Sequence, residues 1–218
     1  MFRTALLSLA AASLVSAAQP AGAAVIDFID HIDNVAGEAA VGAPNGHANP
    51  VVIGGVSMVL GGTAGGDPAY AYFDRGGAGV GVCKTVTASA QCSPSSDDNV
   101  TTGEILSVAF LENLEITGLS FRNSVHRPVF SGSVDISWDG GDNYSRYALA
   151  GDLPVSARVS AFTDILLRYV DDEFYLSAIS FERTPSGASA VPLPGAGLLM
   201  GAGLLALGAA ARRRRARA

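Results

Sequence analysis

The sequence predicts an all-β, antiparallel fold, a sandwich or a barrel, between residues 24 and 183. Three observations predict it. Short runs alternate apolar and polar residues with a period of two, as in half-buried strands. Turn-forming clusters such as "RGGAG", "SPSSDDN" and "DGGDN" separate the runs. Between these limits no long segment has the apolar spacing of an amphipathic helix.

The alternation predicts individual strands. Leu106, Val108 and Phe110 alternate with Ile105, Ser107 and Ala109. In residues 134–138, Trp138 shares the spacing of Val134 and Ile136, so we expect Trp138 to be buried. Residues 161–170 are rich in β-branched and aromatic residues, which favours a strand over a helical turn.

Two other strands carry specific expectations. In "ITGLSFRN" the apolar positions change parity across Gly118, from Leu114 and Ile116 to Leu119 and Phe121, which a β-bulge at Gly118 would explain. In residues 174–181 simple alternation predicts two faces. One face would hold Phe174, Leu176 and Ala178, and the other Tyr175, Ser177, Ile179 and Phe181.

Residues 1–23 have the layout of a secretory signal peptide. Arg3 precedes an apolar stretch over residues 5–18, and Ala21-Gly22-Ala23 supplies the small residues of a cleavage site. The alternative is a hydrophobic helix that is retained in the fold.

Residues 195–211 predict a transmembrane helix. These 17 residues contain no charged or polar side chain. As a helix they would measure ~25 Å, slightly less than the ~30 Å hydrocarbon core of a bilayer. Arginines then follow as a stop-transfer signal in a cytoplasmic tail over residues 212–218, namely Arg212, Arg213, Arg214, Arg215 and Arg217. Residues 184–194, rich in Ser, Ala, Gly and Pro, form the linker before the helix.

The charge of the body excludes nucleic acid as a partner. Residues 24–183 contain eight Lys and Arg against 20 Asp and Glu, a net charge of −12. A domain this acidic repels a phosphate backbone, and the terminal arginines follow directly on the apolar span.

The C-terminus resembles a known sorting signal. Val191, Pro192, Leu193, Pro194 and Gly195, followed by the apolar run and the arginines, resemble the VPLPA-type variant of the PEP-CTERM signal of exported bacterial proteins. Gly195 stands where that type usually has alanine. The resemblance implies transient anchoring in the inner membrane, cutting by an exosortase, and a final place on the cell surface or outside the cell. A plain C-terminal anchor is the alternative.

The resemblance extends into the body. "GVGVC", "QCSPSSDDNV" and "GEILSVAF" are similar to segments that follow one another in many exported PEP-CTERM-type proteins. Those proteins look like jelly-roll or carbohydrate-binding-module-like sandwiches, so the resemblance implies a jelly-roll-like β-sandwich.

Cys83 and Cys92 are the only two cysteines. Because export places them in an oxidising compartment, we expect them to form a disulfide. The alternatives are two free thiols or a metal pair, and no second Cys or His pair lies nearby to complete a zinc site.

Asp97, Asp98 and Asn99 offer hard oxygen ligands for a calcium ion. Asp139, Asp142 and Asn143 form a second, weaker candidate. The alternative for both stretches is that Asp and Asn cap turns in solvated loops.

No catalytic motif is present. The sequence lacks a Gly-x-Ser-x-Gly elbow, a His-Glu-x-x-His pair and a phosphate loop, and His31, His47 and His126 share no ligand spacing. Glu104 and Asp135 could pair as in a glycosidase. The leading expectation is a non-enzymatic exported surface protein.

Two other classes remain open. One is a module that binds extracellular polysaccharide, with or without calcium, through an exposed aromatic row such as Trp138, Tyr144 and Tyr147. The other is a secreted hydrolase, which would need two carboxylates facing each other across a cleft.

Overall fold

The computed structural model describes residues 23–42 and 50–183. The elements in chain order are β1 (Ala24–Asp27), α1 (Phe28–His31), the π-helical turn η1 (Ile32–Ala36), β2 (Ala39–Ala40), β3 (Val51–Ile53), β4 (Val56–Ala64), β5 (Asp67–Asp74), β6 (Gly79–Cys83), β7 (Glu104–Phe110), β8 (Leu114–Arg122), β9 (Ser133–Ser137), β10 (Ser145–Ala148), β11 (Asp152–Val159), β12 (Asp164–Tyr169) and β13 (Tyr175–Arg183). The predicted all-β class is confirmed.

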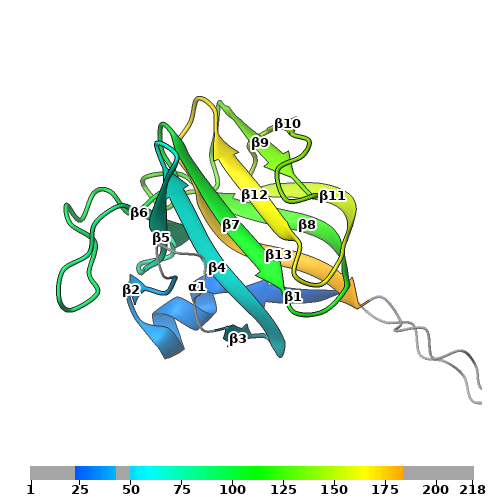
Figure 1. Cartoon of the computed structure of the whole chain (residues 1–218), viewed down its shortest axis with the longest axis horizontal. Helices are drawn as coiled ribbons and strands as arrows, with labels where there is room; N and C mark the ends of the chain where they lie inside the picture. The colour runs from blue at the N-terminus through cyan, green and yellow to red at the C-terminus, as the bar shows by residue number, and fades with distance from the viewer. Residues whose placement is uncertain (1–22, 43–49, 184–218) are drawn as a thin grey trace, which may run out of the picture.

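The strands of the described residues form one antiparallel sheet that curls on itself (Figure 1). The main order is β10-β9-β12-β7-β4-β5-β6-β13-β8-β11, and β1, β2 and β3 pair with β13, β5 and β4. Strand β5 joins the two halves, since its first residues pair with β4 and its last with β6. The half that contains β4, β7 and β12 lies over the half that contains β13 and β8, in a sandwich-like arrangement.

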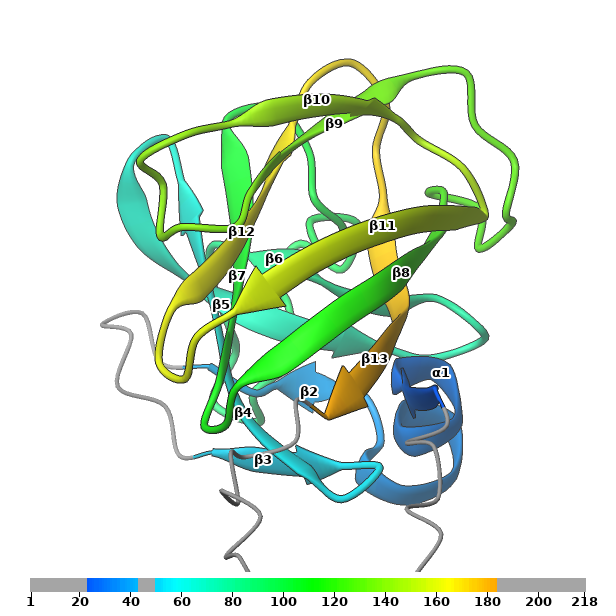
Figure 2. The ribbon, with the colours of Figure 1, turned by 90° about the vertical axis from the view of Figure 1, so that its right-hand side faces the viewer.

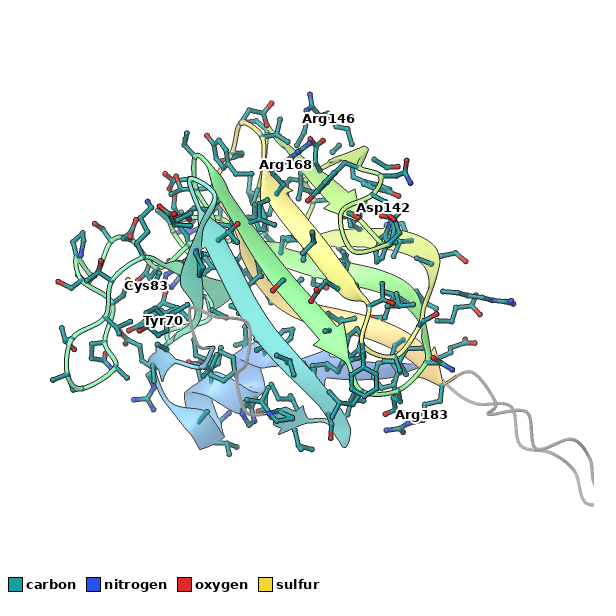
Figure 3. All side chains as sticks on the ribbon, in the orientation of Figure 1. Tyr70, Cys83, Asp142, Arg146, Arg168 and Arg183 are labelled. Carbon is teal, nitrogen blue, oxygen red and sulfur yellow. A yellow bond between two sulfur atoms is a disulfide. The ribbon has the colours of Figure 1, made fainter. Side chains whose placement is uncertain are left out.

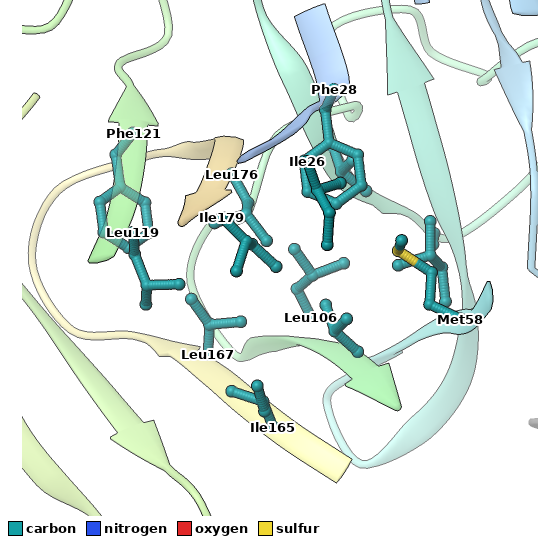
Figure 4. Packing of buried hydrophobic residues seen from close by; sticks show 14 of the residues in the cluster. Ile26, Phe28, Met58, Leu106, Leu119, Phe121, Ile165, Leu167, Leu176 and Ile179 are labelled. Carbon is teal, nitrogen blue, oxygen red and sulfur yellow. The ribbon is translucent and has the colours of Figure 1, made fainter. Parts of the chain in front are cut away.

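The core lies between these two halves (Figure 4). Leu106 from β7 and Leu167 from β12 point toward Leu119 from β8 and Ile179 from β13, and all four are at most 1 % exposed. The predicted alternation of residues 105–110 is confirmed, because every second residue of β7 is buried. Residues 164–169 form a strand, as predicted.

The predicted bulge on β8 is confirmed. Ser180 of β13 pairs with Gly118, but Phe181 pairs with Ile116, so Thr117 is the extra residue. The bulge changes the parity of the strand, and residues on both sides of it therefore reach the same core.

The simple alternation expected for residues 174–181 is wrong. Leu176 pairs with Phe121 and Ala178 with Ser120, so Ser177 is a second extra residue, on β13. This bulge turns both Leu176 and Ile179 into the core, although their positions have opposite parity.

The predicted terminal elements lie outside the described residues. These are residues 1–22 of the signal peptide, the linker and sorting motif over 184–194, the helix over 195–211 and the basic tail over 212–218. Among residues 23–42 and 50–183, no helix has the length and apolarity needed to span a bilayer.

Candidate functional site

The disulfide between Cys83 and Cys92 is present, with an S–S distance of 2.06 Å. Cys83 ends β6, and Cys92 lies in the segment 84–103 between β6 and β7, which we call the acidic loop. Closing a loop of this length stabilises the fold by about 2.5–3 kcal/mol in the chain-entropy model. Figure 3 shows Cys83 at the end of the domain away from Arg183, the last described residue.

Two glycines of "GVGVC" let the backbone of the acidic loop and of β13 pack directly on β6. A Cβ atom on Gly81 would overlap the carbonyl oxygen of Asp98, and the amide of Val82 donates to the carbonyl of Asn99 over 3.3 Å. Gly79 has a φ of 129° and would meet the carbonyl of Leu176. The acidic loop therefore lies against β6 because position 81 has no side chain.

The three residues predicted to bind calcium contact three different partners. Asp97 lies 3.1 Å from Lys84 Nζ, Asp98 accepts a hydrogen bond of 2.6 Å from the Tyr175 hydroxyl, and Asn99 donates to Glu173 over 3.0 Å. In the described part of the chain, no group of three or more His, Cys, Asp or Glu could hold a metal ion. Calcium binding at this loop stays a prediction.

Lys84 also holds the first residue of β7. Its Nζ lies 3.0 Å from Oε1 of Glu104, whose side chain is fully buried. Burial raises the pKa of Glu104, and the hydrogen bond with Glu104 raises the pKa of Lys84. This lysine therefore ties the start of β7 to the acidic loop through two carboxylates.

A polar cluster lies beside the acidic loop. It consists of Asp74 at the end of β5, Asp98, His126 from the segment between β8 and β9, and Tyr175 at the start of β13; we call it the loop-end cluster. His126 Nε2 lies 3.1 Å from Asp74 Oδ2, and its Nδ1 lies 3.1 Å from the carbonyl of Gly76. The His126 and Tyr175 rings meet edge to face, 5.4 Å apart.

Burial perturbs the acids of the loop-end cluster. It raises the pKa of Asp74 to about 6, with a further rise from the charge of Asp98, while His126 lowers it. Burial also raises the pKa of Asp98 and of Tyr175. Titratable groups with shifted pKa values gather at functional sites, which makes this cluster a candidate site. Sequence reasoning identified Asp98 alone as a candidate.

Glu104 and Asp135, the possible glycosidase pair, contact different basic residues. Glu104 is bound by Lys84, whereas Asp135 is bound by two arginines. Arg146 donates two hydrogen bonds of 2.9 and 3.2 Å to Asp135, and Arg168 donates a third of 2.7 Å. The hydrogen bonds from Arg146, followed by those from Arg168, lower the pKa of Asp135.

The aromatic residues do not form an open row. Trp138 is half-buried, not buried as predicted, and it packs on the core together with Tyr147. Its indole donates to the Tyr147 hydroxyl over 3.4 Å. Tyr144 is covered by the guanidinium of Arg168, 4.0 Å from the ring centre. Stacking of a sugar ring on these three residues is not favoured by this arrangement.

The second calcium candidate, Asp139, Asp142 and Asn143, lies in a turn held by internal hydrogen bonds. Asp139 accepts hydrogen bonds from the Ser137 hydroxyl at 2.7 Å and from the backbone and side-chain nitrogens of Asn143 at 3.0 and 2.8 Å. The Ser137 hydrogen bond, then those from Asn143, lower the pKa of Asp139 to about 2. The carboxylate therefore caps the turn, as Asp does in many loops.

No family model, no curated protein and no solved structure matches this chain.

Proposed function

We propose that this chain is an exported bacterial surface protein, held in the inner membrane by its C-terminal segment and cut by an exosortase. Residues 24–183 would be a jelly-roll-like β-sandwich that works outside the cytoplasm, on the cell surface or in the extracellular polymer. No catalytic activity is part of this proposal. The two terminal segments would direct delivery, and the folded body would be the delivered product.

The observation that carries the proposal is the Cys83–Cys92 disulfide. Cytoplasmic thiols are kept reduced, whereas exported proteins meet an oxidising environment. The bond joins β6 to the acidic loop, and both cysteines belong to one buried cluster with Tyr72. A protein whose fold includes this link is suited to a compartment in which the link can form.

The sequence at the C-terminus supports the sorting step. Pro192 and Pro194 lack backbone donors and favour an extended chain, which a membrane protease can accept. The arginines at 212–215 and 217 favour retention of the tail on the cytoplasmic side.

Mass spectrometry of the chain from producing cells tests this proposal. We expect a mass that lacks the signal peptide and the residues after the VPLPG motif, and an intact C-terminus in cells without the exosortase. Pro192→Ala with Pro194→Ala should block the cut, whereas Pro185→Ala in the linker is the matched control. A tail that persists with its arginines in both strains would show a plain anchor instead. Full-length chain with an uncut leader and alkylatable thiols in the cytosol would refute export.

A second candidate function is recognition of the extracellular polysaccharide. The observation that favours it is a hollow on the outer face of the sheet, lined by Ser120, Asp152 and Ser180.

A further inference from the structure

We infer that this hollow, on strands β8, β11 and β13, binds one neutral sugar unit of a polysaccharide. The inference deepens the second candidate function and does not depend on the sorting step. Figure 2 shows β11 and β8 side by side on the face turned to the viewer, with β13 beyond them. The hollow has a volume of about 220 Å³.

The register of the strands fixes the walls and floor of the hollow. Pro154 of β11 pairs with Gly118 of β8, which pairs with Ser180 of β13. Two residues further along the strands, on the same face, Asp152 pairs with Ser120. Strands lie ~4.8 Å apart, so these three strands offer a floor ~10 Å wide.

Gly118, next to the bulge, leaves open space because it has no side chain. A Cβ atom there would lie 3.5 Å from Ser180 Cβ and 3.6 Å from the Leu153 carbonyl, which are ordinary contacts. The φ of Gly118 is not in the left-handed region, so other residues can adopt it. The position is therefore a floor that larger side chains would fill without strain of the backbone.

The chemistry of the lining fits a neutral, hydroxyl-rich ligand. The Ser120 hydroxyl donates to Asp152 Oδ1 over 2.7 Å, which fixes the carboxylate and leaves Oδ2 to accept from a ligand hydroxyl. The Ser180 hydroxyl lies on the β13 side, and Pro154 supplies apolar surface for C–H groups, while the Leu153 side chain packs on the core. Sugars present such hydroxyls beside apolar C–H faces.

Charge and size narrow the ligand further. Among the described residues, no basic side chain lines the hollow, and Asp152 would repel a uronic acid or a sulfate. Sites for drug-sized ligands usually measure about 300–1,000 Å³, so a hollow of 220 Å³ holds a single unit of a chain. A neutral polymer that runs over the sheet would present one such unit at a time.

Affinity electrophoresis of the mature exported chain tests the inference. Native gels would contain dextran, galactomannan or glucomannan as neutral polymers, and alginate as the acidic one. We expect at least one neutral polymer to slow the protein, and alginate to have no effect. Absence of retardation in all three neutral polymers would overturn the inference, and so would equal retardation in alginate.

Two variants locate the binding in the hollow. Gly118→Leu fills the floor of the hollow and should weaken the retardation at least tenfold. Asp152→Asn keeps the shape of the side chain and removes its charge, and it should weaken the retardation about fivefold. Ser107→Ala changes a hydroxyl on β7, in the other half of the sheet, and should bind like the wild type. The inference would be overturned if Gly118→Leu and Asp152→Asn were both retarded as strongly as the wild type. Mass analysis of the same preparations reports the sorting step separately.

Discussion

Replacing Asp74 with asparagine should stabilise the protein at pH 8 and leave its stability at pH 4 almost unchanged. Asp74 is 8 % exposed and lies near the charges of Asp98, Glu38 and His126. Its ionised form is costly there because burial removes water from the carboxylate and Asp98 repels it. Asparagine keeps one oxygen that can accept from His126 and carries no charge.

The magnitude follows from the pKa of Asp74. A rise from 3.8 to about 6 corresponds to about 3 kcal/mol, at about 1.4 kcal/mol for each pKa unit. Because the folded-state pKa lies above the unfolded-state value, the contribution of Asp74 is fully present below pH 4 and is lost as the pH rises through 6. The difference in unfolding free energy between the variant and the wild type should therefore grow by about 2–3 kcal/mol from pH 4 to pH 8.

Urea unfolding at several pH values measures this difference. Asp152→Asn is the matched control, since it removes an exposed carboxylate that also accepts a hydrogen bond from a neighbour, Ser120. The difference in unfolding free energy between Asp152→Asn and the wild type should not change between pH 4 and pH 8. If Asp74→Asn lowers stability equally at pH 4 and pH 8, burial of the charge does not determine the contribution of Asp74 to the unfolding free energy.

Three further predictions concern the acidic loop. Gly81→Ala should lower the unfolding free energy by about 2–4 kcal/mol in calorimetry, because its methyl group displaces Asp98; a neutral result would refute the close packing. Cys83→Ser with Cys92→Ser should cost about 2.5–3 kcal/mol in urea unfolding, and a reductant should lower the wild type to the level of the variant. Adding a chelator should lower the melting temperature if calcium binds at Asp97, and an unchanged melting curve would count against that site.

The sequence predicts those strands that bury one face only. Leu106, Val108 and Phe110 alternate with less buried residues, so the pattern carries the register directly. The bulge at Gly118 could be predicted because the apolar residues change parity there. The second bulge could not, since Tyr175, Leu176 and Ser177 are all buried and parity carries no information in such a stretch.

The loop-end cluster could not be predicted from the sequence. Tyr175 and Asp98 are 77 residues apart, and only the pairing of β13 with its neighbours brings them together. His126 shares no ligand spacing with the other two histidines, so the sequence does not single it out. Trp138 followed the alternation of β9, yet it lies just beyond the strand end, where the sheet no longer covers it fully.

The pairing of β1 with β13 sets an order of events for folding. Ala24 lies opposite Phe181, so the first strand finds its partner only after nearly the whole domain has been synthesised. Until β13 is available, the edge of β1 that pairs with it stays without a partner strand. A chain that stopped before β13 would keep unpaired strand edges and tend to aggregate. Completion of this domain therefore depends on its last strand, β13.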